Sequence, residues 1–348
     1  MKNNKIVIGI TQGDINSISY EVIMKSLMDN RIFEMCTIIV YGSPKVAAYH
    51  RKALNIDNFS FNNIKSPDEA NQRRPNIINC IDENIRVELG KSTDIAGEAS
   101  YMALEKATQH LEEGKIDAIV TGPINKYNIQ SEKFNFPGHT EYLQEKFRGD
   151  SVLMLMVNEF FKIGVVTSHV PISQVPQLIT YDNVMEKLKT INHSLIVDFG
   201  IRKPRIAVLG LNPHASDNGV IGNEEKEHII PAIEDARENE NVLAFGPYPA
   251  DGFFGSGMYS KFDGILAMYH DQGLIPFKSM DVDGGVNFTA GLSAIRTSPA
   301  HGTAFELVGK NEASPESFRK AIYAAIDIFK SRKLNKEITA NPLKTSEQ

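Results

Sequence analysis

The chain has 348 residues, of which 42% are apolar and 23% charged, and its formal net charge is −6 at pH 7. The basic residues are scattered, so the composition excludes nucleic acid as the main partner, although a local cluster of cations can still bind a small anion. A chain of this length exceeds one typical domain, and we therefore expect two lobes.

The sequence contains no stretch that predicts export or a membrane span. The first apolar run, residues 6–11, is too short for the core of a signal peptide. The run that begins near residue 152 is interrupted at Asn158 and Glu159, far short of the ~20 residues of a membrane helix. Cys36 and Cys80 are the only cysteines and do not form a CxxC pair. We expect a cytoplasmic protein with two reduced, structural cysteines and no membrane partner.

Apolar runs alternate with helical periodicity along the first part of the chain. The pattern predicts strands at residues 5–11, 37–41 and 117–121, and helices at residues 20–28 and 98–113. The polar, irregular stretch 58–75 predicts an elaborated surface loop. Strands that alternate with helices over this length indicate a largely parallel α/β sheet.

The same alternation continues in the second part. We expect strands at residues 151–157, 162–167, 205–211, 242–246 and 264–268, and helices at residues 182–199, 224–238 and 314–329. Residues 333–348 are polar and predict a loosely held end. No Pro-, Gly- or Ser-rich linker separates two parts, so we expect lobes that are joined by strands, with the last helix returning to the first lobe.

Residues 263–303 hold the densest set of candidate functional side chains. The apolar run at residues 264–268 ends in the polar sequence Tyr-His-Asp-Gln-Gly, which predicts a turn carrying His270 at the carboxyl end of a strand. Ligands of open α/β sheets bind at such ends. His169 and His214 also follow apolar runs, and three imidazoles with an open position are typical of catalytic zinc. No HExxH or CxxC spacing supports this locally, so the residues alone leave a metal site and three unrelated histidines both open. Four other histidines are expected on solvated faces: His50, His110, His193 and His228.

A second group of side chains predicts an anion site. Cations, hydroxyls and amides of the kind that hold phosphate gather with few acids nearby, at His139, Thr140, Lys278, Asn287 and Arg296. The loop after His214 leads into a predicted helix, and its amides could face a cofactor phosphate, with candidate residues Asn218, Gly219 and Gly222. No GxGxxG follows the first strand, so a standard Rossmann dinucleotide site is unsupported.

Several motifs stand in an order that resembles the 4-hydroxythreonine-4-phosphate dehydrogenase family, NAD-dependent enzymes of pyridoxal phosphate biosynthesis. They are TGPINK, FPGHTEYL, TSHVPI, LNPHA, GPYPAD, LAMYHDQGLIPFK, GVNFTAGL and RTSPAHGTAFE. The resemblance implies a two-lobed isocitrate/isopropylmalate-dehydrogenase-like α/β fold around a central cleft. Its lobes would be residues 1–130 plus 302–348, and residues 131–301. It also implies a homodimer.

The resemblance further implies roles for individual residues. His169, His214 and His270 would bind one divalent metal ion, zinc or else magnesium or cobalt. The phosphorylated substrate would contact His139, Thr140, Lys278, Asn287 and Arg296. For the NAD that the resemblance implies, the candidate contacts are those of the loop after His214, Asn218, Gly219 and Gly222. The implied catalytic residues are Asp251, Asp271 and Lys278, with the two acids near the substrate amine.

Two stretches depart from the family pattern. Where the family has Gly-Asp-Pro-Ala-Gly-Ile-Gly-Pro-Glu, residues 13–21 read Gly-Asp-Ile-Asn-Ser-Ile-Ser-Tyr-Glu. Where Gly-Glu-Gly-Gly is usual after LNPHA, residues 216–219 read Ser-Asp-Asn-Gly. Both departures concern turns that the resemblance places near cofactor and substrate.

The implied reaction is oxidation of 4-phosphohydroxy-L-threonine to 2-amino-3-oxo-4-(phosphooxy)butanoate, which decarboxylates to 3-amino-2-oxopropyl phosphate. The nearest alternative is a sister dehydrogenase that acts on 4-phosphoerythronate or 4-phosphothreonate. Two alternatives of other classes are a metal-dependent hydrolase and a catalytically impaired homologue that only binds the ligand. Formation of NADH separates the dehydrogenases from both.

Overall fold

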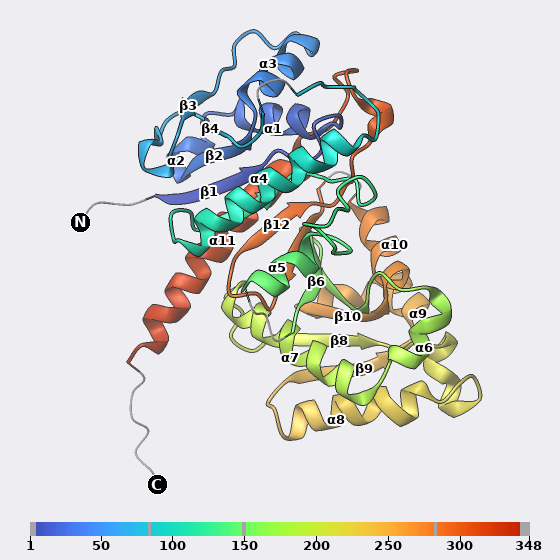
Figure 1. Ribbon diagram of the computed structural model, residues 1–348. Coiled ribbons are helices and arrows are strands. Elements are labelled where there is room, and N and C mark those ends of the chain that lie inside the picture. The colour runs from blue at the N-terminus through green and yellow to red at the C-terminus, as the bar shows by residue number, and fades with distance from the viewer. Residues whose placement is uncertain (1–4, 83–84, 148–150, 282–283, 342–348) are drawn as a thin grey trace. The chain divides into compact units, whose positions relative to one another are not determined.

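The computed structural model describes residues 5–82, 85–147, 151–281 and 284–341. The chain divides into two compact units (Figure 1). Unit 1 consists of Met1–Gly149 and Val282–Ile326, and unit 2 of Asp150–Asp281 and Asp327–Gln348. These bounds are not those of the lobes expected from sequence, which stay a prediction.

The sheet of unit 1 has the strand order β3-β4-β2-β1-β5-β12-β11. Its neighbours are parallel except β11 and β12, which pair antiparallel. The central strands β1, β2 and β5 are almost wholly buried, which explains why their sequences are apolar runs rather than alternating patterns. The strands are β1 (Ile6–Thr11), β2 (Cys36–Gly42), β3 (Asn62–Ile64), β4 (Asn76–Asn79), β5 (Ala118–Thr121), β11 (Val286–Ala290) and β12 (Arg296–Pro299).

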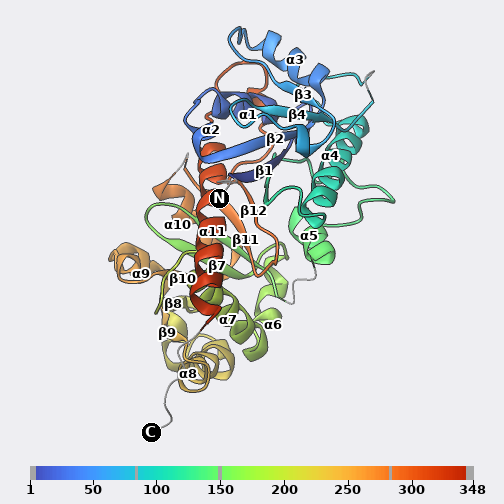
Figure 2. The same cartoon turned by 90° about the vertical axis from the view of Figure 1, so that its left-hand side faces the viewer.

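Five α-helices lie wholly in the described part of unit 1, and a sixth begins there. α4 packs against β1 and β2 (Figure 1, Figure 2), and it begins earlier than predicted because the Thr93 side chain caps it by accepting a hydrogen bond from the Ala96 N–H. α11 begins in unit 1 and reaches residues assigned to unit 2. The helices are α1 (Ser19–Leu27), α2 (Ile32–Met35), α3 (Pro44–Ala53), α4 (Asp94–Glu112), α5 (His139–Phe147) and α11 (Glu316–Thr339).

The sheet of unit 2 has the order β6-β7-β10-β8-β9. β6 and β7 form an antiparallel pair, and the remaining neighbours are parallel. α7 packs against β6, β7 and β10, and α8 against β9. The elements are β6 (Leu153–Val157), β7 (Lys162–Thr167), α6 (Val175–Leu178), α7 (Tyr181–Val197), β8 (Arg205–Leu209), α8 (Ile230–Glu238), β9 (Leu243–Tyr248), α9 (Ala250–Gly255), β10 (Gly264–Tyr269) and α10 (His270–Met280).

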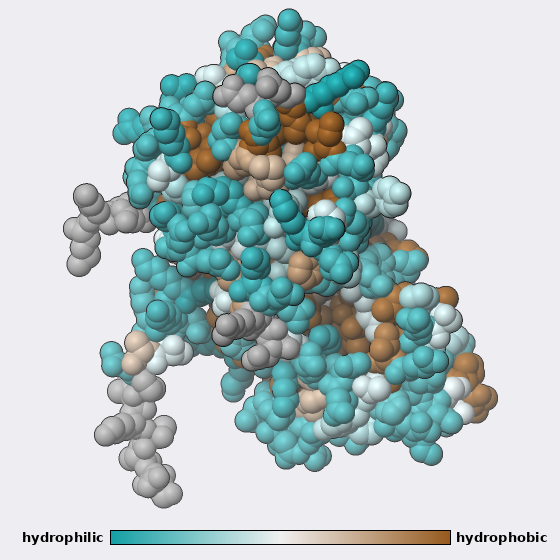
Figure 3. Space-filling view, viewed as in Figure 1, coloured by the Kyte–Doolittle hydropathy of each residue, from teal (hydrophilic) through white to brown (hydrophobic). Residues whose placement is uncertain are grey.

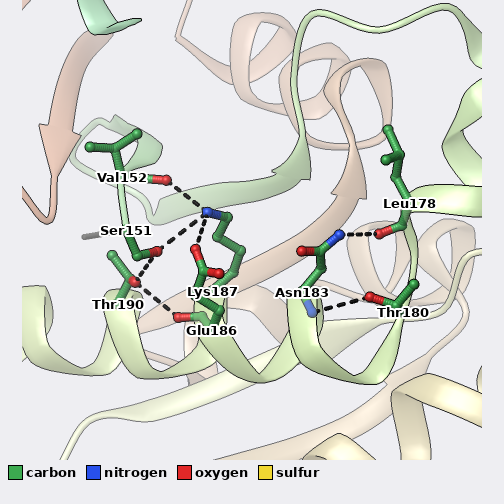
Figure 4. A network of polar contacts seen from close by, with 8 residues as sticks. All are labelled: Ser151, Val152, Leu178, Thr180, Asn183, Glu186, Lys187 and Thr190. Carbon is green, nitrogen blue, oxygen red and sulfur yellow. Dashed lines mark hydrogen bonds and ion pairs between the residues drawn. The ribbon is translucent and has the colours of Figure 1, made fainter. Parts of the chain in front are cut away.

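Polar contacts fasten α7 at both its first and its middle turns (Figure 4). Thr180 caps the helix by accepting a hydrogen bond from the Asn183 N–H at 3.3 Å, and the Asn183 side chain donates to the Leu178 carbonyl at 2.8 Å. Lys187 donates to the Val152 carbonyl at 3.1 Å, immediately before β6 begins. The Lys187 bond ties the helix to the residue before β6, whereas the Thr180 and Asn183 bonds stabilise the start of the helix.

The fold confirms the predicted α/β class and most of the predicted strands, but three local expectations are wrong. Residues 58–75 are more than a loop, because they include β3 and the buried Phe59 and Ile64. The polar sequence after β10 is the first turn of α10 rather than a turn between elements. The helix predicted at residues 224–238 is confirmed, and its first turn, Glu225–Ile229, is π-helical. The described part of the expected loose end is helical as far as Thr339, and residues 342–348 lie outside the described residues.

The prediction that His50 and His110 lie on solvated faces is also wrong, because both are buried. His50 Nε2 lies 2.7 Å from the Ile15 carbonyl oxygen, and His110 Nδ1 lies 2.8 Å from the Tyr41 hydroxyl. Burial lowers the pKa of both imidazoles. Each is therefore a neutral histidine with a hydrogen-bond partner in the core of unit 1.

The surface of the molecule is largely hydrophilic on the face drawn in Figure 3. No helix within the described residues has the length and apolar character needed to cross a membrane.

Candidate functional site

A buried cation cluster lies in unit 1 where β5, β11, β12 and α5 meet. Arg296, the first residue of β12, donates through Nε and Nη2 to the Thr121 hydroxyl at 3.1 and 2.8 Å. Its Nη1 donates to the Thr289 hydroxyl at 3.2 Å, and Nη2 lies 3.4 Å from His139 Nδ1. Thr121 ends β5 and Thr289 lies on β11, so both neighbouring strands of the local sheet supply a hydroxyl.

The guanidinium of Arg296 carries a charge that no described acid neutralises by an ion pair. The residue is 5% exposed, and burial lowers its pKa to about 10, an effect that the Glu141 carboxylate partly offsets. Burying a cation without a paired anion is costly, because hydroxyl partners replace only part of the lost hydration. A bound anion would supply the missing charge.

His139 faces the same cluster as a neutral imidazole. Burial is the main cause that holds the pKa of His139 well below its ordinary value, and the charge of Arg296 adds to it. Because guanidinium can only donate, His139 Nδ1 accepts from Arg296, and the proton of the neutral ring is therefore on Nε2. His139 Nε2 is buried without a hydrogen-bond partner, and so is Asn287 Oδ1 on β11. The cluster thus keeps a donor available for a ligand.

The second candidate region is a pocket in unit 2 with a volume of about 290 Å³. It is formed at the carboxyl ends of β7 and β10, and both His169 and His270 line it. The centroids of these two imidazole rings are 6.0 Å apart. His270 Nδ1 lies 2.7 Å from Asp271 Oδ1, and since a carboxylate only accepts, Nδ1 carries a proton and Nε2 is the atom left to bind a ligand.

His214 follows β8, the other neighbour of β10 in the sheet. It opens a turn of five consecutive non-glycine residues with positive φ, from His214 (φ 56°) to Asn218 (φ 59°), in which Ser216 is buried. Gly219 (φ 93°) continues this backbone, and Gly222 has φ 83°. Asn212 precedes the turn and is held by the buried Glu225, which accepts from the Asn212 N–H at 2.7 Å.

The structure brings together some of the predicted site residues. His139, Arg296 and Thr140 lie together at or beside the buried cation cluster of unit 1. In unit 2, His169, His270 and Asp271 line one pocket. Among the described residues no three His, Cys, Asp or Glu side chains are close enough to hold a metal ion, so His214 does not join the other two histidines. Lys278 is exposed near the end of α10, and Asp251 is exposed in the first turn of α9.

Comparison with known proteins gives a family. A family model described as pyridoxal phosphate biosynthetic protein PdxA matches residues 34–325. A relative from Bacteroides thetaiotaomicron, named 4-hydroxythreonine-4-phosphate dehydrogenase, is 53% identical over 346 residues, which cover 99% of this chain and 94% of the relative. The chain belongs to the PdxA family.

Other relatives agree with this assignment. A crystal structure of a 4-hydroxythreonine-4-phosphate dehydrogenase from Klebsiella pneumoniae matches with a TM-score of 0.80 at 32% identity, covering 94% of this chain and 100% of that one. A relative from Oceanobacillus iheyensis, provisionally named D-threonate 4-phosphate dehydrogenase, is 38% identical. The match covers 94% of this chain and 98% of the relative. These likenesses confirm the predicted isocitrate/isopropylmalate-dehydrogenase-like fold class and place the chain among dehydrogenases.

The turn at residues 13–21, where this PdxA-family chain departs from the family pattern, is buried and closely hydrogen-bonded. The Asp14 carboxylate accepts from the Asn16 N–H and from Asn128 Nδ2, each at 2.8 Å. Asn16 Nδ2 donates to the Lys91 carbonyl at 2.9 Å and to the Thr93 hydroxyl at 3.0 Å. Gly13 is retained with φ 65°, and a Cβ there would lie 2.4 Å from the Pro123 carbonyl oxygen. Side-chain hydrogen bonds from Asn16 thus stabilise this turn without the family's additional glycines and prolines.

Sequence reasoning overlooked the hydroxyls of Thr121, Thr289 and Thr167. The first two bind Arg296, and the third lines the unit 2 pocket. Threonine is an ordinary strand residue, so nothing in its type marks it. The one available signal is position, because Thr121 and Thr167 each end a predicted strand.

Proposed function

We propose that this protein oxidises 4-phosphohydroxy-L-threonine with NAD, giving 2-amino-3-oxo-4-(phosphooxy)butanoate, which decarboxylates to 3-amino-2-oxopropyl phosphate in pyridoxal phosphate biosynthesis. The proposal draws its substrate from the names of its relatives. The structural observation that carries it is the buried guanidinium of Arg296, which forms no ion pair with a described acid and so fits a phosphorylated substrate.

In this proposal the phosphate group binds at the cation cluster. Arg296 offers charge-assisted hydrogen bonds, which are stronger than neutral ones. His139 Nε2 donates from its unpartnered position, and Thr140 adds a hydroxyl in the first turn of α5, where the helix dipole also favours an anion. Asn287 and Lys278 are the remaining proposed phosphate ligands. Fixing one end of the substrate this way holds the reacting carbon in place.

Two residues of the unit 2 pocket have side chains of the kind that bind a divalent metal ion, although the described residues bring no group of three such side chains together. His169 and His270 present two imidazoles to one pocket, and His214 follows the strand next to that of His270. We propose that these three hold zinc, with magnesium or cobalt as alternatives. When bound, the metal would act as a Lewis acid that lowers the pKa of the substrate hydroxyl. Asp271 orients His270 by accepting its Nδ1–H.

The turn after His214 is the proposed contact for NAD. Asn218 and Gly222 are exposed and Gly219 is half-buried, so the backbone of these proposed contacts reaches the surface. When bound, NAD would accept the hydride. Asp251, Asp271 and Lys278 are the proposed acid–base groups of the site.

The decisive experiment is absorbance at the reduced nicotinamide band with purified protein, NAD and each candidate substrate, with and without added Zn²⁺. The proposal expects NADH from 4-phosphohydroxy-L-threonine. A faster reaction with 4-phosphothreonate or 4-phosphoerythronate would favour the sister activity, for which the relative from Oceanobacillus iheyensis is the supporting observation. No NADH from any of them, together with hydrolysis, would favour a metal-dependent hydrolase, and binding without turnover an impaired homologue.

We also propose a homodimer in which each site uses residues of both chains. Mixing a His139→Ala protein with a His270→Ala protein should then restore part of the lost activity. A light-scattering mass equal to one chain at micromolar concentration would refute the dimer.

A further inference from the structure

The register of two strand pairs gathers three buried side chains on one face of the unit 1 sheet. β12 pairs with β5 in parallel, with Arg296 opposite Ile119, so Thr121 lies two residues further along β5 and on the same face. β11 and β12 pair antiparallel (Figure 2), and one step beyond the last pair of their register sets Thr289 opposite Arg296. The side chains of Arg296 and of both threonines are buried.

The two threonines hold the guanidinium of Arg296 along separate edges. Thr121 accepts the Nε–H at 3.1 Å and an Nη2 N–H at 2.8 Å, so one hydroxyl spans a whole edge of the guanidinium. Thr289 accepts an Nη1 N–H at 3.2 Å. Hydrogen bonds on two edges of one rigid plane fix both its position and its rotation, which the flexible side chain alone does not do.

These contacts decide which N–H groups of the cluster remain for a ligand. Arginine has five N–H groups, one on Nε and two on each Nη. The Nε group, both Nη2 groups and one Nη1 group meet acceptors among the described residues, because the second Nη2 group faces His139 Nδ1 at 3.4 Å. One Nη1 N–H of Arg296 therefore remains, and His139 Nε2, which has no hydrogen-bond partner in the described part of the chain, is the second donor. An anion would meet the arginine through one N–H rather than a fork, so its binding depends on where that N–H points.

The reach of Arg296 also depends on Thr121. Backbone pairing places Arg296 level with Ile119, but its guanidinium binds two residues further along, at the carboxyl end of β5. Ligands of open α/β sheets bind at such strand ends. Loss of the Thr121 hydroxyl would leave two buried N–H groups of a cation without their acceptor, so we expect the guanidinium to shift.

We propose that Thr121 and Thr289 are positioning residues that aim the remaining Nη1 N–H of Arg296 at the phosphate group of the substrate. Through Nη2, the same contacts also orient the ring of His139. This inference rests on the phosphate part of the proposed function. Thr121 accepts two N–H groups and Thr289 one, so the Thr121 hydroxyl should contribute more.

The test measures affinity for inorganic phosphate by titration calorimetry on the full chain, alongside the thermal midpoint of each variant. Thr121→Val removes the hydroxyl with little change in volume. It should weaken phosphate binding by about tenfold, which corresponds to ~1.4 kcal/mol, close to the net contribution of one hydrogen bond to a charged group. Thr289→Val should weaken binding by a smaller factor, and Thr121→Ser, which keeps the hydroxyl, should restore most of the affinity. In turnover, Thr121→Val should raise KM for 4-phosphohydroxy-L-threonine by a larger factor than it lowers kcat.

Thr297→Val is the matched control. Thr297 is the next residue of β12 and equally buried, so its side chain points to the other face of the sheet, where its hydroxyl donates to the Ala321 carbonyl at 2.8 Å. The substitution removes one hydrogen bond of a buried threonine from the same strand. It should lower the thermal midpoint and leave phosphate affinity unchanged.

The variants separate failure of this inference from failure of the phosphate site. Unchanged phosphate affinity in Thr121→Val, while Arg296→Ala abolishes binding, would refute the positioning role and leave the phosphate site in place. A loss in Thr297→Val equal to that in Thr121→Val would refute the positioning role too, because it would show a general loosening of β12. Wild-type protein that binds no phosphate, or binding that Arg296→Ala does not weaken, would overturn both proposals. If Thr121→Val does not fold, Thr289→Val compared with Thr297→Val decides the question.

Discussion

Arg296 Nη2 and His139 Nδ1 lie 3.4 Å apart in the interior of unit 1, although both belong to residue types that can carry a positive charge. The arrangement is stable because burial and the neighbouring guanidinium hold the pKa of His139 far below its ordinary value. The cluster therefore contains one unneutralised cation and one available imidazole N–H. A phosphate would complement both at once.

Removing the guanidinium should reduce turnover of the phosphorylated substrate. We expect Arg296→Ala to lower kcat/KM for 4-phosphohydroxy-L-threonine by at least about tenfold, which corresponds to roughly 1.4 kcal/mol of transition-state binding. Non-phosphorylated hydroxythreonine should be a poor substrate for both proteins and lose little further. Arg31→Ala is the control, since Arg31 is exposed and pairs with Asp29. Equal losses for both substrates would argue against a phosphate site.

The metal proposal predicts about one divalent ion per chain in active protein. His169→Ala, His214→Ala and His270→Ala should each abolish most Zn²⁺ binding and turnover while the far-UV spectrum is retained, because all three side chains lie at strand ends rather than in the core. His193→Ala removes another exposed histidine of unit 2 and should change neither. Full activity in protein that elemental analysis shows to be metal-free would contradict the proposal.

Apolar strands of this fold could be predicted, and polar ones could not. β1, β2, β5 and β10 are nearly wholly buried, so their sequences form short hydrophobic runs. β11 and β12 were not predicted, because they carry buried polar residues. Several of these residues form hydrogen bonds with residues that lie far away in the sequence. Thr297 donates to the Ala321 carbonyl at 2.8 Å, for example. Such hydrogen bonds make a polar strand stable but leave no local pattern.

The first turn of α10 shows why local signals also misled the site prediction. Gly273 and Pro276 suggest a turn, yet both lie inside the helix. Gly273 is required by packing, because a Cβ there would lie 3.1 Å from a Val165 methyl group on β7. Burial of Leu274 and Phe277 favours the helix over its local propensity. The sequence correctly indicated which histidines follow strands, but the hydroxyls around Arg296 appear only when three strands are paired.

The buried His50 predicts a loss of stability in acid. Its pKa is lowered in the folded protein, so below about pH 6.5 the unfolded chain binds a proton that the folded chain does not. The free energy of unfolding should therefore fall as pH drops below that value, by up to about 1.4 kcal/mol per pH unit for one such group, until the folded-state pKa is reached. His50→Gln should reduce this slope in urea unfolding between about pH 7.5 and 5. His193→Gln, at an exposed position, is the control and should keep the wild-type slope.

Gly13 and Gly114 allow backbone strain and steric crowding to be separated. Their φ values are 65° and 67°, but a Cβ at Gly13 would meet the Pro123 carbonyl at 2.4 Å, whereas nothing lies within 4 Å at Gly114. Gly114→Ala should cost only the ~1–2 kcal/mol of left-handed backbone. Gly13→Ala should cost clearly more in the free energy of unfolding, because the backbone around the turn must also move. Equal losses in urea unfolding would show that this turn adapts to a side chain.

Asp271 can be tested for two separate contributions. Its carboxylate accepts from His270 Nδ1 at 2.7 Å, and we also propose that it lies near the substrate amine. Asp271→Asn keeps an oxygen that can accept from His270 but removes the charge, whereas Asp271→Ala removes both. If the charge attracts the amine, Asp271→Asn should lower kcat/KM for 4-phosphohydroxy-L-threonine by about tenfold and leave 4-phosphoerythronate, which has no amine, unaffected. If orientation of His270 is the main role, Asp271→Asn should be mild, and Asp271→Ala should weaken Zn²⁺ binding and slow both substrates alike. Steady-state kinetics of both variants on both substrates, with Zn²⁺ affinity measured in parallel, separates the two, and wild-type values throughout would exclude Asp271 from either role.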